Sequence, residues 1–268
     1  VWMPLGWFNH NGLHPISVTF FSYLLLVIFL LPLNYSLIKK FFFSPALFLL
    51  GVSYGLTNIF FNWAIVTGDI VRVVFLFYLM PIWASIFARI LLKELISFKG
   101  YLTLFFAMLG LILILDFKNL VENLNNLNLS SEEIFSDFIA LLGGIFFALG
   151  TVLLKKTKLQ NSMSRSFSIF FGSCMVSFFF LCLSYFFNIF KFENQNIFLV
   201  NLESNIIFSL FTFSIVLGLA NFFLQYGGSK LLVQTTSLLM LTEIIVAISS
   251  TTYFEKNNLV FLDYMGGF

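Results

Sequence analysis

Eight apolar segments of about membrane-spanning length constrain the fold of this chain more than any other feature. They comprise residues 16–38, 43–66, 72–92, 100–116, 135–154, 166–187, 204–226 and 231–253. A helix that crosses a bilayer needs about 20 predominantly apolar residues. In lipid, a helix is also the form in which a single segment satisfies its own backbone hydrogen bonds. The sequence therefore predicts an all-α integral membrane protein.

The composition agrees with lipid as the solvent. Of the 268 residues, 60% are hydrophobic and only 10% are charged, whereas a soluble domain has about 25% charged residues. Apolar sequence also opens the chain at residues 1–8 and closes it at residues 259–268. We expect these two stubs to be truncated first and last helices, which gives ten helices in the complete protein.

Two of the apolar segments carry related sequences. Residues 55–63 read GLTNIFFNW and residues 218–226 read GLANFFLQY, so that four of the nine positions are identical. Doubled hydrophobic halves with matching polar positions are common among membrane transporters. We therefore predict two five-helix repeats, residues 1–117 and 135–268, joined by an extracytoplasmic linker at residues 118–134.

Lys and Arg are distributed unevenly among the links between the segments. If the complete first helix runs outward from the cytoplasm, ten of the 14 cations lie inside and four lie outside, and this bias sets orientation. The inner cations are Lys39, Lys40, Arg89, Lys93, Lys99, Lys155, Lys156, Lys158, Arg165 and Lys230, and the outer ones are Arg72, Lys118, Lys191 and Lys256. We expect a protein of the cytoplasmic (inner) membrane, with both termini of the full-length protein in the cytoplasm.

The number of helices in each repeat also determines how the repeats are related. Five is an odd number, so the second repeat enters the membrane from the side opposite to the first. The sequence thus predicts inverted repeats, an architecture in which the substrate site lies near the membrane centre between the halves.

Amide side chains recur on one helix face in each repeat. Asn58 and Asn62 are four residues apart and share a face, and Asn221 and Gln225 occupy the equivalent positions in the second repeat. One interpretation is that these amides hydrogen-bond between helices and hold them together. The other is that both faces line a central cavity and offer donors and acceptors to a solute.

Aromatic and small residues accompany the amides. Trp63 and Tyr226 follow at equivalent positions, where aromatic residues either anchor a helix at the membrane interface or contact a substrate. Small residues four apart are predicted to allow close helix packing. These pairs are Gly51/Gly55, Ala84/Ala88 and Gly144/Ala148.

Two charged residues and one proline stand out within the apolar segments. Arg72 either snorkels to lipid headgroups or points inward and attracts a carboxylate. Pro81 removes a backbone hydrogen bond and is predicted to kink its helix as a hinge. Glu243 lies in the middle of a span, where a carboxylate is a functional candidate by default; the alternative is a hydrogen-bonded structural acid.

The run RVVFLFYLMPIWASIFARILLKE at residues 72–94, together with the five-plus-five layout, resembles the EamA-type domain of the drug/metabolite transporter superfamily. The second copy, QTTSLLMLTEIIVAISSTTYFE, has Glu243 where the family pattern often has a proline, as at Pro81. The paired GLTNIFFNW and GLANFFLQY motifs further resemble the branch of aromatic and neutral amino-acid exporters. Tyr78 and Gln234, which lie in these two runs, are also predicted to bind substrate.

These features predict a secondary active transporter that moves small metabolites, with amino acids or related solutes as the leading candidates, by alternating access. The predicted substrate-binding residues are Asn58, Asn62, Trp63, Arg72, Tyr78, Asn221, Gln225, Tyr226, Gln234 and Glu243. The expected partners are a small-molecule substrate, the lipid bilayer and a coupling ion or proton, without nucleic acid. An integral-membrane enzyme acting on a lipid-linked substrate, and a non-transporting receptor or scaffold, are the alternatives.

Enzymatic and cofactor chemistry has little support in the sequence. The chain has no glycine-rich phosphate loop and no Cys/His ligand cluster, which are the patterns that hold nucleotides and metals. We therefore expect no enzymatic activity, no cofactor and no metal.

Overall fold

The computed structural model describes residues 2–33, 35–94, 98–114, 131–187, 204–243 and 246, so most of the predicted linker and residues 247–268 lie outside it. The described residues are mainly helical. In chain order the helices are α1 (Trp2–His10), α2 (Pro15–Leu30), the 3-10 turn η1 (Leu31–Leu33), α3 (Ser36–Phe43), α4 (Pro45–Thr67), α5 (Ile70–Phe77), α6 (Met80–Phe87), the π-helical turn η2 (Ala88–Leu92), α7 (Phe98–Ile114), α9 (Ser131–Lys156), α10 (Ser162–Phe187), α11 (Ser204–Lys230) and α12 (Val233–Met240).

Five helical segments within the described residues are long and apolar enough to cross a membrane. They are Pro45–Thr67, Arg72–Leu92, Glu133–Lys156, Ser162–Phe186 and Ser204–Lys230. Two shorter apolar helices cover Pro15–Leu30 and Gly100–Ile112. For the described residues, the prediction of an all-helical fold is thereby confirmed, and these five segments are consistent with the predicted integral membrane protein.

The first predicted segment, residues 16–38, is not one continuous helix. α2 ends at Leu30, η1 follows, and α3 begins anew at Ser36. Pro32 lies in η1, and a proline lacks the N–H that would continue an α-helical hydrogen-bond ladder. The expectation of an uninterrupted span at residues 16–38 was therefore wrong.

The helix that contains Pro81 is interrupted rather than only bent. α5 ends at Phe77, and α6 begins at Met80 with Pro81 in its first turn. Proline is well suited to the first turn of a helix, because its missing N–H would have no intrahelical partner there. The interruption leaves Tyr78 between the two helices, with its side chain buried.

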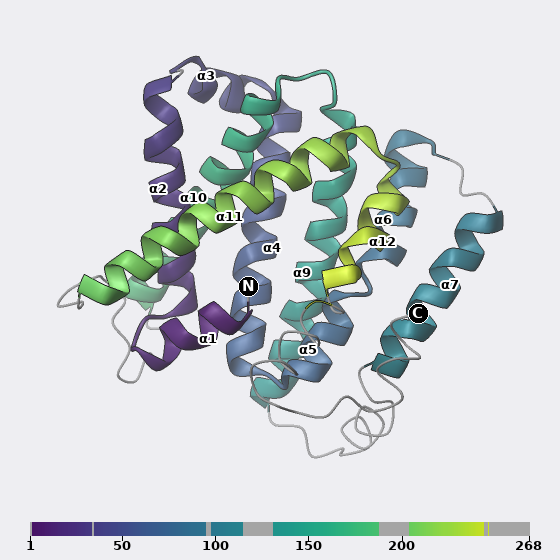
Figure 1. The fold of residues 1–268 in the computed structure, drawn as a ribbon, viewed down its shortest axis with the longest axis horizontal. Helices are drawn as coiled ribbons and strands as arrows, with labels where there is room; N and C mark the ends of the chain where they lie inside the picture. Colours follow the sequence, from purple (N-terminus) through teal and green to yellow (C-terminus); the bar gives the residue numbers. More distant parts are fainter. Residues whose placement is uncertain are drawn as a thin grey trace.

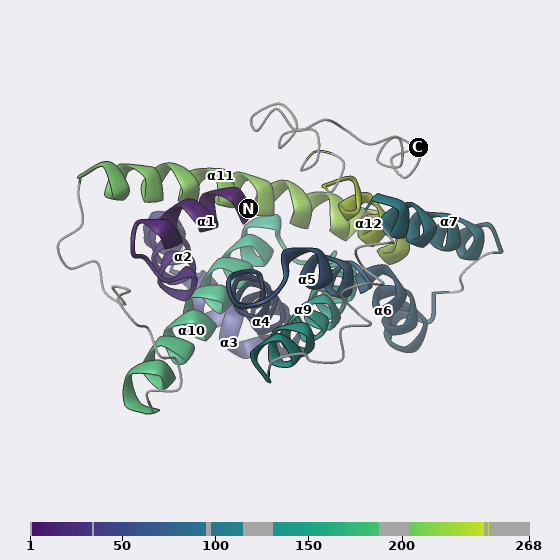
Figure 2. The same cartoon turned by 90° about the horizontal axis from the view of Figure 1, so that it is seen from below.

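The helices form a bundle crossed by one long helix. Figure 1 shows α2, α10, α4 and α9 beside one another, with α11 running diagonally across them. α4 packs on both α9 and α10, α10 packs on α2, and α5 and α6 pack on α9. In the view from below, α11 extends along one face of the bundle (Figure 2). The largest buried cluster joins α2, α4, α9 and α10 through aromatic and aliphatic side chains.

Glycines let α4 and α10 approach until their backbones touch. A Cβ atom added to Gly51 would lie 2.3 Å from the carbonyl oxygen of Ser168, and one added to Gly172 would lie 2.2 Å from the carbonyl carbon of Gly51. One turn further along α4, a Cβ on Gly55 would lie 2.9 Å from the carbonyl oxygen of Gly172. The prediction that Gly51 and Gly55 permit close packing is confirmed.

The other small-residue pairs also lie at helix contacts. A Cβ on Gly144 would lie 2.6 Å from the carbonyl oxygen of Phe77. Ala84 and Ala88 belong to a buried cluster with Ala148. These contacts bring α5 and α6 against α9, and they hold the interrupted helix beside the bundle core.

Candidate functional site

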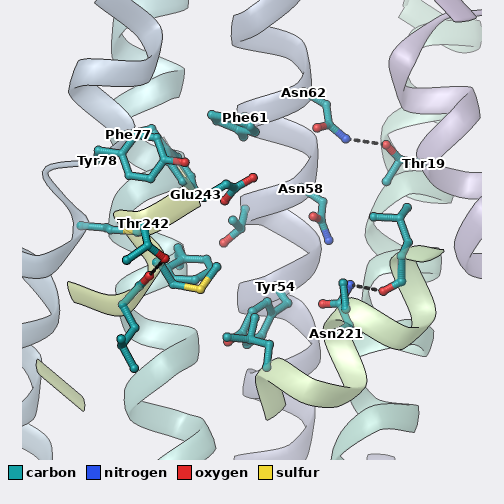
Figure 3. A pocket seen from close by; sticks show the side chains of 18 of the residues that line it. Thr19, Tyr54, Asn58, Phe61, Asn62, Phe77, Tyr78, Asn221, Thr242 and Glu243 are labelled. Atoms are coloured by element: carbon teal, nitrogen blue, oxygen red, sulfur yellow. Dashed lines mark hydrogen bonds between the residues drawn. The ribbon is translucent and has the colours of Figure 1, made fainter. Parts of the chain in front are cut away.

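A cavity of about 480 Å³ lies between helices of the first and second predicted repeats. Its walls come from α2, α4, α5, α6, α9, α11 and α12 and from residues that follow α12. Figure 3 shows the side chains that surround it. The volume is in the range of small-molecule sites, which are usually about 300–1,000 Å³. We call this space the central cavity.

The amides of the two repeats meet on one hydroxyl group at the central cavity. Asn58 of α4 donates its side-chain N–H to the Tyr23 hydroxyl at 3.0 Å and to Ser173 at 3.1 Å. Asn221 of α11 donates to the same Tyr23 hydroxyl at 3.3 Å. Tyr23 is only 2% exposed and comes from α2. One tyrosine thus joins equivalent asparagines that are 163 positions apart in the sequence.

Further hydrogen bonds hold the polar wall in place. Asn62 donates to Thr19 of α2 at 2.7 Å, and Asn221 also donates to the Leu217 carbonyl oxygen at 2.9 Å. Figure 3 draws the contact between Asn62 and Thr19. Because Asn58, Asn62 and Asn221 also line the cavity, they join helices and border the cavity at the same time, so the two interpretations of the amide faces are compatible.

An acid and a tyrosine from two different helix ends face each other across another part of the cavity. Tyr78 lies in the interruption between α5 and α6, and its hydroxyl lies close to the Glu243 carboxyl group. Glu243 lies just beyond α12. Both residues line the central cavity, and Figure 3 shows their side chains close together.

One buried hydroxyl in the cavity wall is left without a partner. Tyr54 lines the cavity and is 2% exposed, and its hydroxyl has no hydrogen-bond partner among the described residues. Most buried polar groups are hydrogen-bonded, so each exception needs an explanation. A polar group of a bound ligand or a water molecule would supply the missing bond.

Gln225 lies outside the central cavity. It is completely buried and accepts a hydrogen bond from Arg165 Nε at 2.9 Å, while its amide nitrogen donates to Ser162 at 2.5 Å. Arg165 also donates to Ser229 at 3.2 Å and to carbonyl oxygens in the α9–α10 link. Gln225 therefore ties α11 to the beginning of α10.

These contacts predict the effect of removing the Gln225 side chain. Gln225→Ala leaves Arg165 Nε and Ser162 without their buried partner, which typically costs about 1–3 kcal/mol. We expect a lower free energy of unfolding and a lower Tm in thermal unfolding of the detergent-solubilised protein. Gln160→Ala is the control, because its side chain is exposed and Arg165 uses only its backbone oxygen. Equal Tm values for both variants would contradict this role.

Four other predicted site residues also lie away from the central cavity. Arg72 is 5% exposed and forms an ion pair with Asp137 of α9. Tyr226 is on the exposed side of α11, with the Lys230 amine 3.9 Å from its ring centroid. The remaining two have structural contacts: Trp63 stacks edge-on against Phe135 at 5.0 Å, and Gln234 donates to the Gly100 carbonyl oxygen at 2.7 Å.

The residues that line the central cavity overlap with the predicted site only in part. Five of the ten predicted residues line the cavity: Asn58, Asn62, Tyr78, Asn221 and Glu243. Tyr23 and Tyr54 line it as well and were not predicted. The sequence signal for both is a tyrosine, which carries a hydroxyl group, in the middle of an apolar segment. No group of three or more His, Cys, Asp or Glu side chains that could hold a metal occurs among the described residues.

Comparisons with known proteins agree with this arrangement of helices. Residues 6–116 match the model of a family described as the EamA-like transporter family. A solved structure named only "Crystal structure of protein" superposes with a TM-score of 0.73 over 99% of this chain and 88% of that chain. At 11% sequence identity, this likeness concerns the fold alone. The sequence matches no curated protein.

Proposed function

We propose, because residues 6–116 match the model of the EamA-like transporter family, that the chain is a secondary active transporter. It moves small metabolites across the cytoplasmic membrane by alternating access, with the central cavity as the substrate site. The observation that carries the proposal is the convergence of Asn58 and Asn221 on Tyr23 at a cavity between the two repeats.

The way in which the helices pair supports an inverted repeat. If the two halves are repeats of each other, α4 is the equivalent of α11 and α10 is the equivalent of α2. The packing of α4 on α10 in one half should then have a counterpart in the packing of α11 on α2, and both contacts are present. The equivalent glycines of the repeated motif, Gly55 and Gly218, also contact equivalent helices. A Cβ on Gly55 would lie 2.8 Å from Val176 of α10, and one on Gly218 would lie 2.6 Å from Leu26 of α2. These contacts favour repeats at residues 1–117 and 135–268, and ten helices in the complete protein.

The interruption between α5 and α6 is the place where we expect the first repeat to move during transport. Transporters built from inverted repeats often place interrupted helices at the substrate site. Here the interruption before Pro81 and the end of α12 meet at the Tyr78–Glu243 contact. In our proposal, Pro81 is the hinge of the first repeat, and the contact breaks when the two halves rock from one open state to the other. The cation bias of the links orients the cycle, with Lys39 and Lys155 on the cytoplasmic side.

The cavity chemistry suits a solute that carries an ammonium group. Glu243 contributes a carboxyl group to the cavity wall, and hydrogen bonds to charged groups contribute about 1.5–3 kcal/mol. Amino acids and related solutes, the candidates that the sequence predicts, all carry such a group. Glu243 is also the group that would bind a coupling proton when no substrate amine lies beside it.

Transport by the purified protein in sealed vesicles tests the proposal. Vesicles loaded with an unlabelled solute would be diluted into the same labelled solute, for a panel of amino acids and the corresponding amines. We expect transient accumulation of label for at least one member, because a carrier exchanges solute across the membrane. Protein-free vesicles are the control. Equal label in both kinds of vesicle for every member of the panel would contradict the proposed function.

The role of Tyr23 makes a further prediction. Tyr23→Phe removes the hydroxyl that accepts hydrogen bonds from Asn58 and Asn221, and an unsatisfied buried donor costs about 1–3 kcal/mol. We expect a several-fold lower transport rate and a lower Tm. Tyr185→Phe on the exposed side of α10 is the matched control. If the two variants transport at the same rate, Tyr23 does not link the halves.

A further inference from the structure

The described residues around the central cavity carry charge of one sign. Among the residues that line it, Glu243 is the only one with a charged side chain, and no Lys, Arg or His is present in the described wall. Arg72, which the sequence suggests as a partner for a substrate carboxylate, is instead paired with Asp137 and lies outside the wall. An anionic group in the cavity would therefore lie near a like charge without a cation to pair with it.

Aromatic rings form a continuous wall beside this acid. Phe61 lies 4.2 Å from Phe77 between ring centroids, Phe77 lies 6.0 Å from Phe147, and Phe147 lies 5.8 Å from Tyr54. Phe77 also contacts Tyr78, the partner of Glu243, at 5.5 Å. The faces of aromatic rings attract organic cations, and their area suits an apolar body. The wall therefore favours a molecule that is cationic at one end and apolar at the other.

The amides offer acceptors to such a cation. Asn58, Asn62 and Asn221 use their side-chain nitrogens in hydrogen bonds to the protein. The hydrogen bonds found for these three asparagines among the described residues all use the side-chain nitrogens and not the oxygens, and all three residues line the cavity. An ammonium group has only donors. Its N–H groups match these oxygens and the Glu243 carboxylate, whereas a substrate carboxylate has only acceptors.

We propose that the central cavity selects organic amine cations with an aromatic or alkyl body and no carboxylate, and discriminates against the amino acids with the same side chain. The preference rests on the proposed function, since it names the substrate class of the same site. Removing a carboxylate from water without a cationic partner is costly. An amino acid must desolvate its carboxylate to enter this cavity, whereas the corresponding amine has no carboxylate to desolvate.

Four ligands with one aromatic body test this selectivity. They are phenethylamine, phenylalanine, 3-phenylpropionate and 2-phenylethanol, which differ in whether they carry an ammonium group, a carboxylate, both or neither. Binding to the purified protein would be measured by isothermal titration calorimetry. We expect phenethylamine to bind at least tenfold more tightly than each of the other three. Tighter or equal binding of phenylalanine would overturn the proposal.

Variants of Glu243 test whether this residue causes the preference for the amine. Glu243→Gln is expected to weaken phenethylamine binding at least tenfold and to leave 2-phenylethanol binding within about twofold, whereas Glu94→Gln, an acid outside the cavity wall, changes neither. Full amine affinity in Glu243→Gln would overturn the assignment to this residue. If Glu243→Gln does not fold, Glu243→Asp keeps the charge and is expected to retain the preference for phenethylamine over phenylalanine, and its loss would contradict the proposal.

Binding and transport can fail separately. If wild-type protein binds phenethylamine selectively but no solute crosses the vesicle membrane, the proposed transport is wrong and the selectivity stands. If vesicles exchange phenylalanine but not phenethylamine, transport stands and the amine selectivity is overturned. If the protein neither binds nor transports phenethylamine, the selectivity is overturned as well.

Discussion

Replacing Gly172 by alanine is expected to destabilise the protein severely, although only one methyl group is added. The new Cβ would lie 2.2 Å from the carbonyl carbon and 2.4 Å from the Cα of Gly51. Both atoms belong to the backbone of α4, so no side-chain rotation relieves the clash. Overpacking usually costs about 1–3 kcal/mol, and we expect the upper end of this range or more. The measurement is the Tm of the detergent-solubilised protein together with its yield in the membrane.

A glycine with open surroundings provides the control for Gly172. Gly227 of α11 has no atom within 4 Å of an added Cβ. Gly227→Ala is therefore expected to leave the free energy of unfolding unchanged or to raise it by about 0.5–1 kcal/mol, since alanine favours a helix more than glycine does. If Gly172→Ala has the Tm of Gly227→Ala, then α4 and α10 do not touch as described.

Replacing Glu243 by glutamine is expected to reduce transport roughly tenfold to a hundredfold. Glutamine keeps the shape of the side chain and an oxygen that can accept the Tyr78 hydroxyl, but it removes the negative charge. Losing a hydrogen bond to a charged group costs about 1.5–3 kcal/mol, which corresponds to this range of rates. We also expect the pH dependence of transport to weaken, because the variant has no carboxyl group to bind a proton.

Membrane insertion and Tm are expected to stay at wild-type values in Glu243→Gln. Initial rates of labelled-amine exchange in vesicles, measured over a range of acidic to alkaline pH, check both expectations, with Glu94→Gln as the control. A wild-type rate with wild-type pH dependence in Glu243→Gln would make the acid a structural one.

Much of the candidate site could be predicted because repetition in the sequence reports on equivalent positions in space. Asn58 and Asn221 occupy matching places in the repeated motif, and the structure brings both to the Tyr23 hydroxyl. The spacing of glycines was equally informative, since Gly51 and Gly55 lie on the α4 face that meets α10. Helical periodicity is enough to place such residues on a face, and lipid leaves few alternatives to a helix.

The partners of individual side chains could not be predicted in the same way. Gln225 lies on the amide face, but it is bound by Arg165 from α10, and Arg72 is bound by Asp137 from α9. Each of these contacts joins residues at least 60 positions apart. The periodicity of one helix shows which way a residue faces, whereas its partner depends on which helix packs there. Tyr23 was missed for this reason, because its own segment is not part of the repeated motif.

Accessibility of a cysteine in the central cavity from each side of the membrane tests the central claim most directly. Ala220 lines the cavity, whereas its neighbour Leu219 does not. Each would be replaced by cysteine in a protein with Cys174→Ser and Cys182→Ser, and labelled in oriented vesicles with a charged, membrane-impermeant thiol reagent. Alternating access predicts that Ala220→Cys reacts from both sides, more slowly when a transported solute is present, and that Leu219→Cys stays unreactive. Reaction of Ala220→Cys from one side only, at a rate that no transported solute changes, would contradict the account.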